Sequence, residues 1–450
     1  MSQEIPRLSA NTREYVGTNA FDNDKLERRQ LAEKFTTYLD RLNDGAVLAI
    51  DAPWGEGKTW FARNWEADLK EKNYKTIYID AFEQDYVDES FILLASELME
   101  IIKENGSASD SKKFKTSATK IAKSTLSIGS KVGMNLATRV LLGNIDLNDE
   151  IEKSIGEVGS SAADGISKYI EDKFDNYKNE KEANEEFKNV LTTYALKQEK
   201  PIVIFIDELD RCKPNFAVSL IERIKHYFDV PNVVFILLLN KEQLENAIKG
   251  VYGINTDATK YLDKFINFYF NLPKQNKEDH RTQYKIENFI KVTMQKYSFT
   301  KSKDNDSFMK WLEYWSGYFS LSLRDLEKCV ALYAFAYPTN AAYLLVYFII
   351  LKVKQPKLFN MLMNNDIKAQ SEAKQQMEDI IKIYMKENNV DEKNIDKSLT
   401  FYFDLHNSYI ENNFKDFETN YSEYFRGLHI FSIKDFFKSL MRKINIDMER

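Results

Sequence analysis

The stretch that decides the fold of this chain reads Ala52-Pro53-Trp54-Gly55-Glu56-Gly57-Lys58-Thr59. It matches the phosphate-binding P-loop pattern G-x-x-x-x-G-K-[ST], except that Ala52 stands in place of the first glycine. The apolar residues 46–50 before it predict a short buried strand, and residues 60–72 after it predict a helix. A strand, a loop and a helix in this order are the context that a P-loop requires.

The residue types of the loop suit the binding of phosphate. Backbone N–H groups of such a loop form a concave anion site, and the following helix adds the positive end of its dipole. Gly57 lets the backbone approach a phosphate, Lys58 would reach the β- and γ-phosphates, and the Thr59 hydroxyl would hold Mg²⁺. Ala52 is compatible with this role if its φ angle is negative. The competing interpretation is a glycine-containing turn with a solvated lysine.

A second segment, residues 201–211, is an apolar run that ends in an acidic cluster, Asp207-Glu208-Leu209-Asp210. A continuous apolar run is typical of a strand covered on both faces of a parallel sheet. Asp207 falls at the carboxyl end of this strand, where ligands of open α/β sheets bind, and would hold Mg²⁺ through water. Glu208 would orient and activate the attacking water. A solvated turn is the competing interpretation, and the P-loop argues against it.

A third apolar run, residues 233–239, ends in Asn240. Asn240 either hydrogen-bonds the γ-phosphate or the water as a sensor, or caps the helix that begins near Lys241. Three strands with such ends predict a nucleotide-binding α/β domain. We therefore assign catalysis to Lys58, Glu208 and Asn240, and metal binding to Thr59 and Asp207. Nucleotide contacts are expected from Trp54, Gly55, Glu56, Gly57, Lys58, Thr59 and Trp60.

These motifs resemble those of the KAP family of P-loop NTPases. Residues 54–59 are similar to its W-G-x-G-K-[ST], and residues 205–212 to its F-I-D-D-L-D-R-C, with Glu208 replacing the second aspartate. Residues 79–82 keep only the alanine of its F-N-A-W. Two further matches are weaker. Residues 261–265 and 272–273 resemble its Y-L-x-K-[IF] and the following L-P, and residues 322–326 resemble a P-R-x-[IL] element of its helical lid, without the proline.

The resemblance implies ATP or GTP as ligand, Mg²⁺ as cofactor, and a signalling or switch role. For many bacterial members it also implies phage exclusion or other antiviral defence, often at membranes. Arg324 would sense the γ-phosphate from a helical lid; a surface charge on a helix is the competing interpretation. Arg211 would be a second basic group near the site, although we favour an ion pair with Asp207 or Asp210.

Composition bounds the remaining possibilities. The chain has 450 residues, 43% hydrophobic and 29% charged, which indicates a globular protein of two or three domains. A net charge of −6 argues against bulk electrostatic binding of nucleic acid. Two cysteines give no disulfide framework, and the polar residues 1–13 do not resemble a signal peptide, so we expect a cytoplasmic protein. The longest apolar run, residues 341–351, is shorter than the roughly 20 residues of a membrane span and predicts a core helix.

We predict an α/β fold in which a P-loop NTPase core with a parallel sheet carries an inserted helical segment and a C-terminal helical lid or bundle. The first part of the core takes residues 1–102, the insertion 103–195, the second part of the core 196–273, the lid 274–365 and a C-terminal helical region 366–450. Aromatic residues recur at helical spacing in the lid and are interpreted as core.

The insertion begins with a basic stretch, residues 103–139, whose local charge is +6 from eight basic and two acidic residues. An acidic stretch, residues 146–186, follows it. We favour a hairpin in which the two halves pair, ahead of peripheral contact with the inner face of a membrane and of nucleic-acid binding. Small residues in the insertion also suit helix packing in a homo-oligomer.

Two classes of function stay open at this point. The first is a nucleotide hydrolase whose turnover drives a conformational change, and the second is a nucleotide-gated scaffold, oligomeric or at a membrane surface, with little hydrolysis. A nucleic-acid-stimulated motor is a weaker third interpretation. A partner protein is expected for either of the first two classes, since no separate effector domain is visible.

Overall fold

The computed structural model describes residues 16–22, 24–42, 44–86, 90–125, 181–272, 280–337, 342–388, 397–421 and 441–445. The chain divides into two compact units, which are described separately. The α/β unit comprises residues 14–54 and 58–274, and the helical unit takes in residues 275–450 together with residues 55–57. The predictions about residues 1–13 and about the middle of the insertion, residues 126–180, lie outside the described residues.

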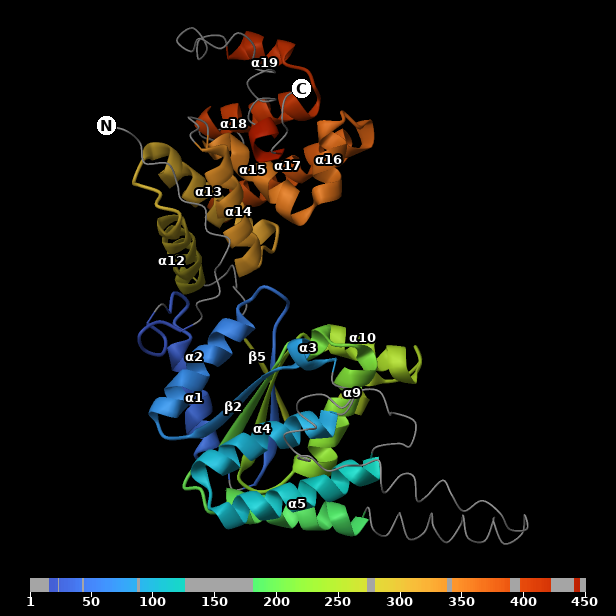
Figure 1. The fold of residues 1–450 in the computed structure, drawn as a ribbon. Coiled ribbons are helices and arrows are strands. Elements are labelled where there is room, and N and C mark those ends of the chain that lie inside the picture. Colours follow the sequence, from blue (N-terminus) through green and yellow to red (C-terminus); the bar gives the residue numbers. More distant parts are fainter. Residues whose placement is uncertain are drawn as a thin grey trace, which may run out of the picture. The chain divides into compact units, whose positions relative to one another are not determined.

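The α/β unit is built on a five-stranded sheet of order β2-β3-β4-β1-β5, in which all neighbouring strands are parallel (Figure 1). The strands are β1 (Ala46–Asp51), β2 (Lys75–Asp80), β3 (Ile202–Asp207), β4 (Val233–Leu239) and β5 (Phe268–Asn271). All carboxyl ends therefore lie along one edge of the sheet. Since β4 lies between β1 and β3, the residues after β4 lie between the P-loop and the acidic cluster.

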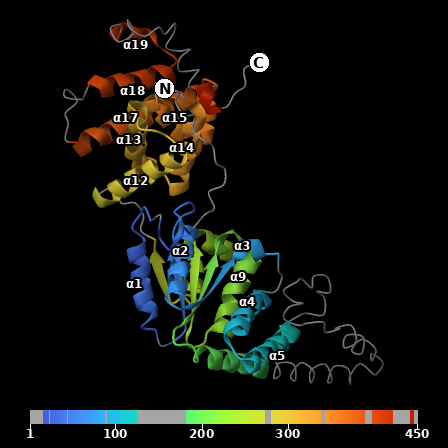
Figure 2. The same ribbon diagram turned by 60° about the vertical axis from the view of Figure 1, so that its left-hand side comes forward.

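Helices cover both faces of this sheet, as the apolar runs predict (Figure 2). One face packs against α1 (Arg29–Leu39) and α2 (Lys58–Glu71), and receives the side chains of Val203 and Phe205. The other face receives Ile202, Ile204 and Ile206. It is covered by α4 (Ser90–Asn105), α9 (Pro214–Arg223), α10 (Lys241–Tyr252) and the helical residues 181–195. Shorter elements of the unit are α3 (Ala81–Gln84), the 3₁₀ turn η1 (Leu209–Arg211), the π-helical turn η2 (Ile224–Phe228) and α11 (Ala258–Leu262).

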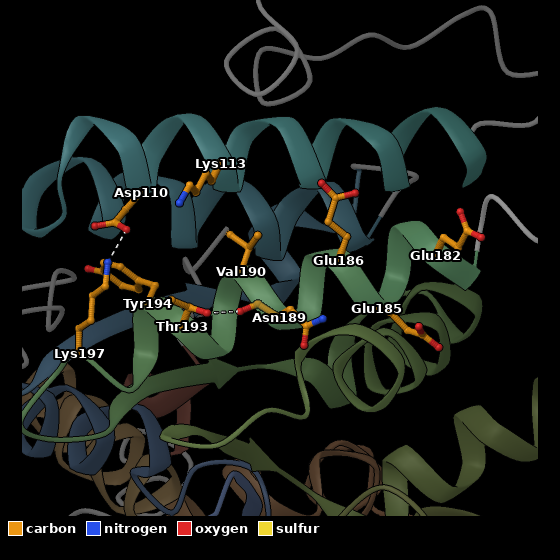
Figure 3. Close-up of a pocket in the computed structure, with 10 residues that line it drawn as sticks. All are labelled: Asp110, Lys113, Glu182, Glu185, Glu186, Asn189, Val190, Thr193, Tyr194 and Lys197. Atoms are coloured by element: carbon orange, nitrogen blue, oxygen red, sulfur yellow. Dashed lines mark hydrogen bonds and ion pairs between the residues drawn. The ribbon is translucent and has the colours of Figure 1, made fainter.

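The ends of the predicted insertion pack on each other. Its predicted boundary at residue 103 falls inside α4, and α5 (Ala108–Thr125) lies beside the helical residues 181–195 (Figure 3). Phe187 is fully buried there, with its ring 5.3 Å from that of Phe114. Ion pairs join Lys120 to Glu186 at 2.6 Å and Lys197 to Asp110 at 2.6 Å. Of the acidic stretch 146–186, only residues 181–186 are described, and Glu186 of this part pairs with Lys120 of α5. The hairpin of the two halves stays a prediction.

The helical unit contains helices only, among its described residues. They are α12 (His280–Lys296), α13 (Lys303–Tyr318), α14 (Leu323–Ala336), α15 (Ala342–Lys354), α16 (Pro356–Met363), α17 (Ile367–Asn388), α18 (Lys397–Ile410) and α19 (Lys415–Asn420). Residues 345–351 of α15 are all buried, so the longest apolar run is a core helix, and Trp315 packs edge-on against Tyr347. No helix in the described ranges is both long enough and apolar enough to cross a membrane.

Candidate functional site

The loop between β1 and α2 has the backbone of a phosphate-binding turn. Gly55 and Gly57 have φ angles of +88° and +75°, which residues other than glycine rarely adopt. Ala52 keeps a negative φ, is buried, and donates its N–H to the carbonyl oxygen of Leu239 at 3.1 Å. Ala52 therefore extends the pairing of β1 with β4 by one residue. This position does not need a glycine, and the one departure from the P-loop pattern is structurally neutral.

Lys58 begins α2, two residues before the predicted helix start, and its ammonium group is buried against the loop. The Nζ atom donates to the carbonyl oxygens of Ala52 at 2.6 Å and Pro53 at 3.3 Å. Burial lowers the pKa of Lys58, and the nearby carboxylates, first Asp210 and then Asp207, oppose this effect. Lys58 is thus a cation held inside the loop by carbonyl groups, which an incoming phosphate would replace as its partners.

Thr59 and Asp207, the two predicted metal-binding residues, are in direct contact. The Thr59 Oγ1 atom donates a hydrogen bond of 2.6 Å to Asp207 Oδ2, although the two residues are 148 positions apart. Tyr78 Oη donates to the same oxygen at 2.8 Å, and the backbone N–H of Glu208 donates to Asp207 Oδ1 at 2.8 Å. Two donors on one oxygen and one on the other fix the carboxylate in place.

The environment of Asp207 suits a bound metal cation. Asp207 is 2% exposed, and burial raises its pKa against the three hydrogen bonds, which lower it. In the part of the chain that the structure describes, no side-chain cation forms an ion pair with it. A buried carboxylate carries a charge that a cation would compensate, and Mg²⁺ prefers oxygen ligands such as this carboxylate and the Thr59 hydroxyl. The residues present therefore fit Mg²⁺.

Glu208 has an unusual backbone and an ion pair that the sequence did not predict. Its φ of 58° and ψ of 23° lie in the left-handed region, which costs a glutamate about 1 kcal/mol or more. The Glu208 Oε1 atom is 2.8 Å from Nη1 of Arg211. The expected ion pair of Arg211 with Asp207 or Asp210 was therefore wrong in its partner, because the short turn after β3 places positions 208 and 211 side by side. Burial raises the pKa of Glu208, and Arg211 opposes this.

Asn240 precedes α10 but does not cap it. Its side chain makes no capping hydrogen bond. Instead, Asp51 Oδ1, at the end of β1, accepts the backbone N–H of Lys241 at 2.9 Å. The capping interpretation of the Asn240 side chain was therefore wrong. The sensor role of Asn240 stays a prediction, at the strand end that lies between the P-loop and the acidic cluster.

The remaining predicted residues have varied surroundings. Trp54 is 45% exposed, and its indole N–H donates to the Asp210 carboxylate, which ties the loop to η1. Trp60 packs edge-on against Phe21, with ring centroids 5.8 Å apart, so its side chain belongs to the core of the unit. Glu56 is half-buried in the loop.

Arg324 lies in the first turn of α14, in the helical unit, and is exposed. The family's proline is replaced by Leu323, the first residue of this helix. The Ser322 hydroxyl accepts the N–H of Asp325 at 3.2 Å, and the Asp325 carboxylate accepts the N–H of Ser322 at 3.0 Å. This reciprocal capping box starts the helix without a proline. The role of Arg324 as a γ-phosphate sensor stays a prediction.

Sequence reasoning gave no role in the site to three residues of this part of the unit: Tyr78, Asp51 and Asp210. Asp210 gave a usable signal, because it belongs to the acidic cluster after β3. Asp51 ends β1, but its contact with Lys241 depends on β4 being the neighbour of β1. Tyr78 gave no signal, since its hydrogen bond to Asp207 depends on the register of β2 beside β3, in which Tyr78 lies opposite Phe205.

Comparisons with known proteins agree with these motifs. A family model described as the KAP family P-loop domain matches residues 28–432. A stretch of 83 residues is 25% identical to the phage T7 exclusion protein of Escherichia coli (strain K12), and covers 18% of this chain and 11% of that protein.

Among solved structures, the ADPNP–ADP complexes of the Aeropyrum pernix ORC2 protein align with a TM-score of 0.36 and 11% identity, over 88% of each chain. The ADP form of the same protein aligns with a TM-score of 0.33 and 10% identity, over 88% of this chain and 87% of that one. These two likenesses are too distant to bear on function. The family match takes in nearly the whole chain, with the P-loop and the acidic strand inside it. This protein therefore belongs to the KAP family of P-loop NTPases.

Proposed function

We propose that this chain is a Mg²⁺-dependent hydrolase of ATP or GTP whose turnover sets a conformational switch. The observation that carries the proposal is the 2.6 Å hydrogen bond between Thr59 of the P-loop and Asp207 of the acidic strand. It joins a phosphate-binding element to a metal-binding one. Glu208, the next residue along the chain, supplies a carboxylate at the same strand end.

Each residue has a definite task in this proposal. The ammonium group of Lys58 leaves the carbonyl groups of Ala52 and Pro53 and donates to the β- and γ-phosphates. The Thr59 hydroxyl donates its hydrogen bond to Asp207, so a lone pair of the hydroxyl oxygen stays available for the metal. Mg²⁺, when bound, would neutralise the charge that builds up between the β- and γ-phosphates.

Glu208 would orient a water and accept its proton. For that task its carboxylate must turn from Arg211 toward the phosphate. The raised pKa of Glu208 makes it a better proton acceptor than an exposed glutamate, as a general base requires.

The test is Glu208→Gln, which keeps the shape of the side chain and removes its basicity. We expect phosphate release to fall by at least about 100-fold, with nucleotide still bound, because general-base catalysis contributes a factor of this order. Glu104→Gln, a change at an exposed position of α4, is the matched control and should hydrolyse as wild type does. Wild-type turnover by Glu208→Gln would refute the assignment.

The ion pair of Glu208 with Arg211 favours a second candidate, a nucleotide-gated scaffold with little hydrolysis. A base held by a guanidinium group is not available to water, so nucleotide binding could order an assembly without turnover. Light scattering with and without Mg²⁺ and nucleotide, run beside phosphate release, separates the two candidates. Assembly without phosphate release supports the scaffold, and phosphate release that follows assembly supports the hydrolase.

A role in phage exclusion, in the cytoplasm or at the inner face of the membrane, is a proposal that rests on family membership and on the short match to the T7 exclusion protein. Phage plating on cells that carry the wild-type chain or Lys58→Ala tests it. We expect wild type to lower the efficiency of plating and Lys58→Ala to restore it. Equal plating on both strains and on cells without the chain would contradict this role.

A further inference from the structure

We infer that Tyr78 is a positioning residue for the metal site, which orients the Thr59–Asp207 pair toward the cation. The inference rests on the proposed function and adds a residue to it. Tyr78 lies on β2, one strand away from Asp207, and its hydroxyl donates at 2.8 Å to the same Oδ2 atom that accepts from Thr59. Tyr78 therefore contacts the Asp207 carboxylate from the neighbouring strand.

The ring of Tyr78 is held on both sides, so its hydroxyl has little freedom. The guanidinium carbon of Arg63 lies 3.4 Å from the ring centroid. The Phe205 ring, opposite Tyr78 in the register of β2 and β3, stacks with it at 6.0 Å and an interplanar angle of 18°. Arg63 is four residues after Thr59 on α2, so both lie on the same face of one helix. Helix α2 thus contacts Asp207 through Thr59 and Tyr78 through Arg63.

This arrangement decides how the carboxylate can serve a cation. The Oδ2 atom already accepts two hydroxyl hydrogens, and Oδ1 accepts the N–H of Glu208. With both oxygens engaged, Asp207 keeps the Thr59 hydroxyl hydrogen pointing toward itself and would hold a cation through water. Without the Tyr78 donor, Asp207 Oδ2 could turn away from Thr59, and the Thr59 lone pair would lose its fixed direction. Partners of this kind typically change metal affinity by about 10- to 100-fold.

The test variant is Tyr78→Phe, which removes the hydroxyl and leaves the ring between Arg63 and Phe205. The matched control is Tyr74→Phe. Tyr74 immediately precedes the same strand, and its hydroxyl also donates to an aspartate, Asp40, at the other end of the sheet. Three quantities are measured in each protein: the Mg²⁺ concentration for half-maximal hydrolysis, kcat at saturating Mg²⁺, and the nucleotide dissociation constant in EDTA.

For Tyr78→Phe we expect the half-saturating Mg²⁺ concentration to rise about tenfold, with kcat at saturating Mg²⁺ and the dissociation constant in EDTA within about twofold of wild type. Tyr74→Phe should match wild type in all three. A second variant, Arg63→Gln, loosens the ring but keeps both hydroxyl bonds. It should raise the Mg²⁺ requirement by a smaller factor, and it tests the same idea should Tyr78→Phe fail to fold.

Failure of the inference and failure of the proposed function give different results. Wild type that hydrolyses nucleotide with Mg²⁺, beside a Tyr78→Phe variant with an unchanged Mg²⁺ requirement, overturns the role of Tyr78 alone. An equal loss in Tyr74→Phe and Tyr78→Phe also overturns it, since the effect would then be one of stability. Wild type with no response to Mg²⁺ in binding or turnover overturns the proposed function, and the role of Tyr78 with it.

Discussion

Asp207 is a buried acid in the α/β unit. Its surroundings suit cation binding, although burial of its ionised form lowers the stability of the fold. Burial raises its pKa, so the folded protein holds this proton more tightly than the unfolded chain does. Stability from this source is complete below the ordinary pKa of an aspartate and is lost as the pH rises through the pKa of the folded state. Above the pKa of the folded state, the protein without Mg²⁺ therefore carries a charge that costs stability. This is typical of a site prepared for a cation.

We predict that Asp207→Asn leaves the ligand-free protein within about 2 °C of the wild-type Tm at pH 7, because the removed charge offsets the lost N–H contact from Glu208. Nucleotide should stabilise the variant equally with Mg²⁺ and with EDTA, whereas wild type should gain a further stabilisation from Mg²⁺. Thermal denaturation of both proteins without ligand, with nucleotide and Mg²⁺, and with nucleotide and EDTA measures this. A large drop in Tm without ligand would show that the carboxylate stabilises the fold, contrary to this account.

The pair of Glu208 and Arg211 predicts a pH dependence of turnover. Hydrolysis needs the carboxylate form of Glu208, so the rate rises with pH through the pKa of this group. Burial raises that pKa and Arg211 lowers it in the free enzyme, so Arg211→Ala should move the acid limb of the pH–kcat/KM profile, which reports the free enzyme, to higher pH. Arg41→Ala, at an exposed position after α1, is the control and should leave the profile unchanged. A shift of the limb to lower pH would contradict the prediction.

At the scale of elements, the strongest sequence signals were strands β1, β3 and β4. Each is a run of apolar residues covered on both faces, and each ends in a polar residue at the carboxyl edge. Strand β5 was missed because its four residues lie at the sheet edge, where Phe268 is 50% exposed, and a short edge strand has no long apolar run. Arg211 was paired with the wrong acids because a sequence does not reveal the left-handed turn at Glu208.

The contact between α5 and residues 181–195 gives a stability prediction at this scale. The Phe187 ring is fully buried among the rings of Phe91, Phe114 and Phe228, at centroid distances of 5.3 to 5.4 Å. Phe187→Ala should therefore lower the free energy of unfolding by about 3–5 kcal/mol. Leu196→Ala, at a site that is 61% exposed, should lower it by less than about 1 kcal/mol. Urea denaturation compares the two, and equal losses would mean that Phe187 is not part of the core.

At the scale of the whole molecule, the chain combines an α/β unit that carries Lys58, Thr59 and the acidic strand with a helical unit that carries Arg324. The fold class could be predicted from the sequence, and Thr59 and Asp207 could be singled out together as metal-binding candidates, because strand ends and loop chemistry are local signals. The positions of Tyr78 and Asp51 could not, since each depends on which strands are neighbours. Family membership adds the expectation of a switch without naming its trigger or its partner.

Every role proposed for these residues depends on nucleotide binding at this P-loop with the help of Mg²⁺. The most direct measurement is the dissociation constant of ATP and of GTP, with Mg²⁺ and with EDTA, for wild type and Lys58→Ala. We predict that wild type binds at least one of them, more tightly with Mg²⁺, and that Lys58→Ala weakens binding by about 100-fold or more, since the buried ammonium group is the main cation of the loop. Binding that is unchanged in Lys58→Ala, or absent from wild type under every condition, would contradict the account.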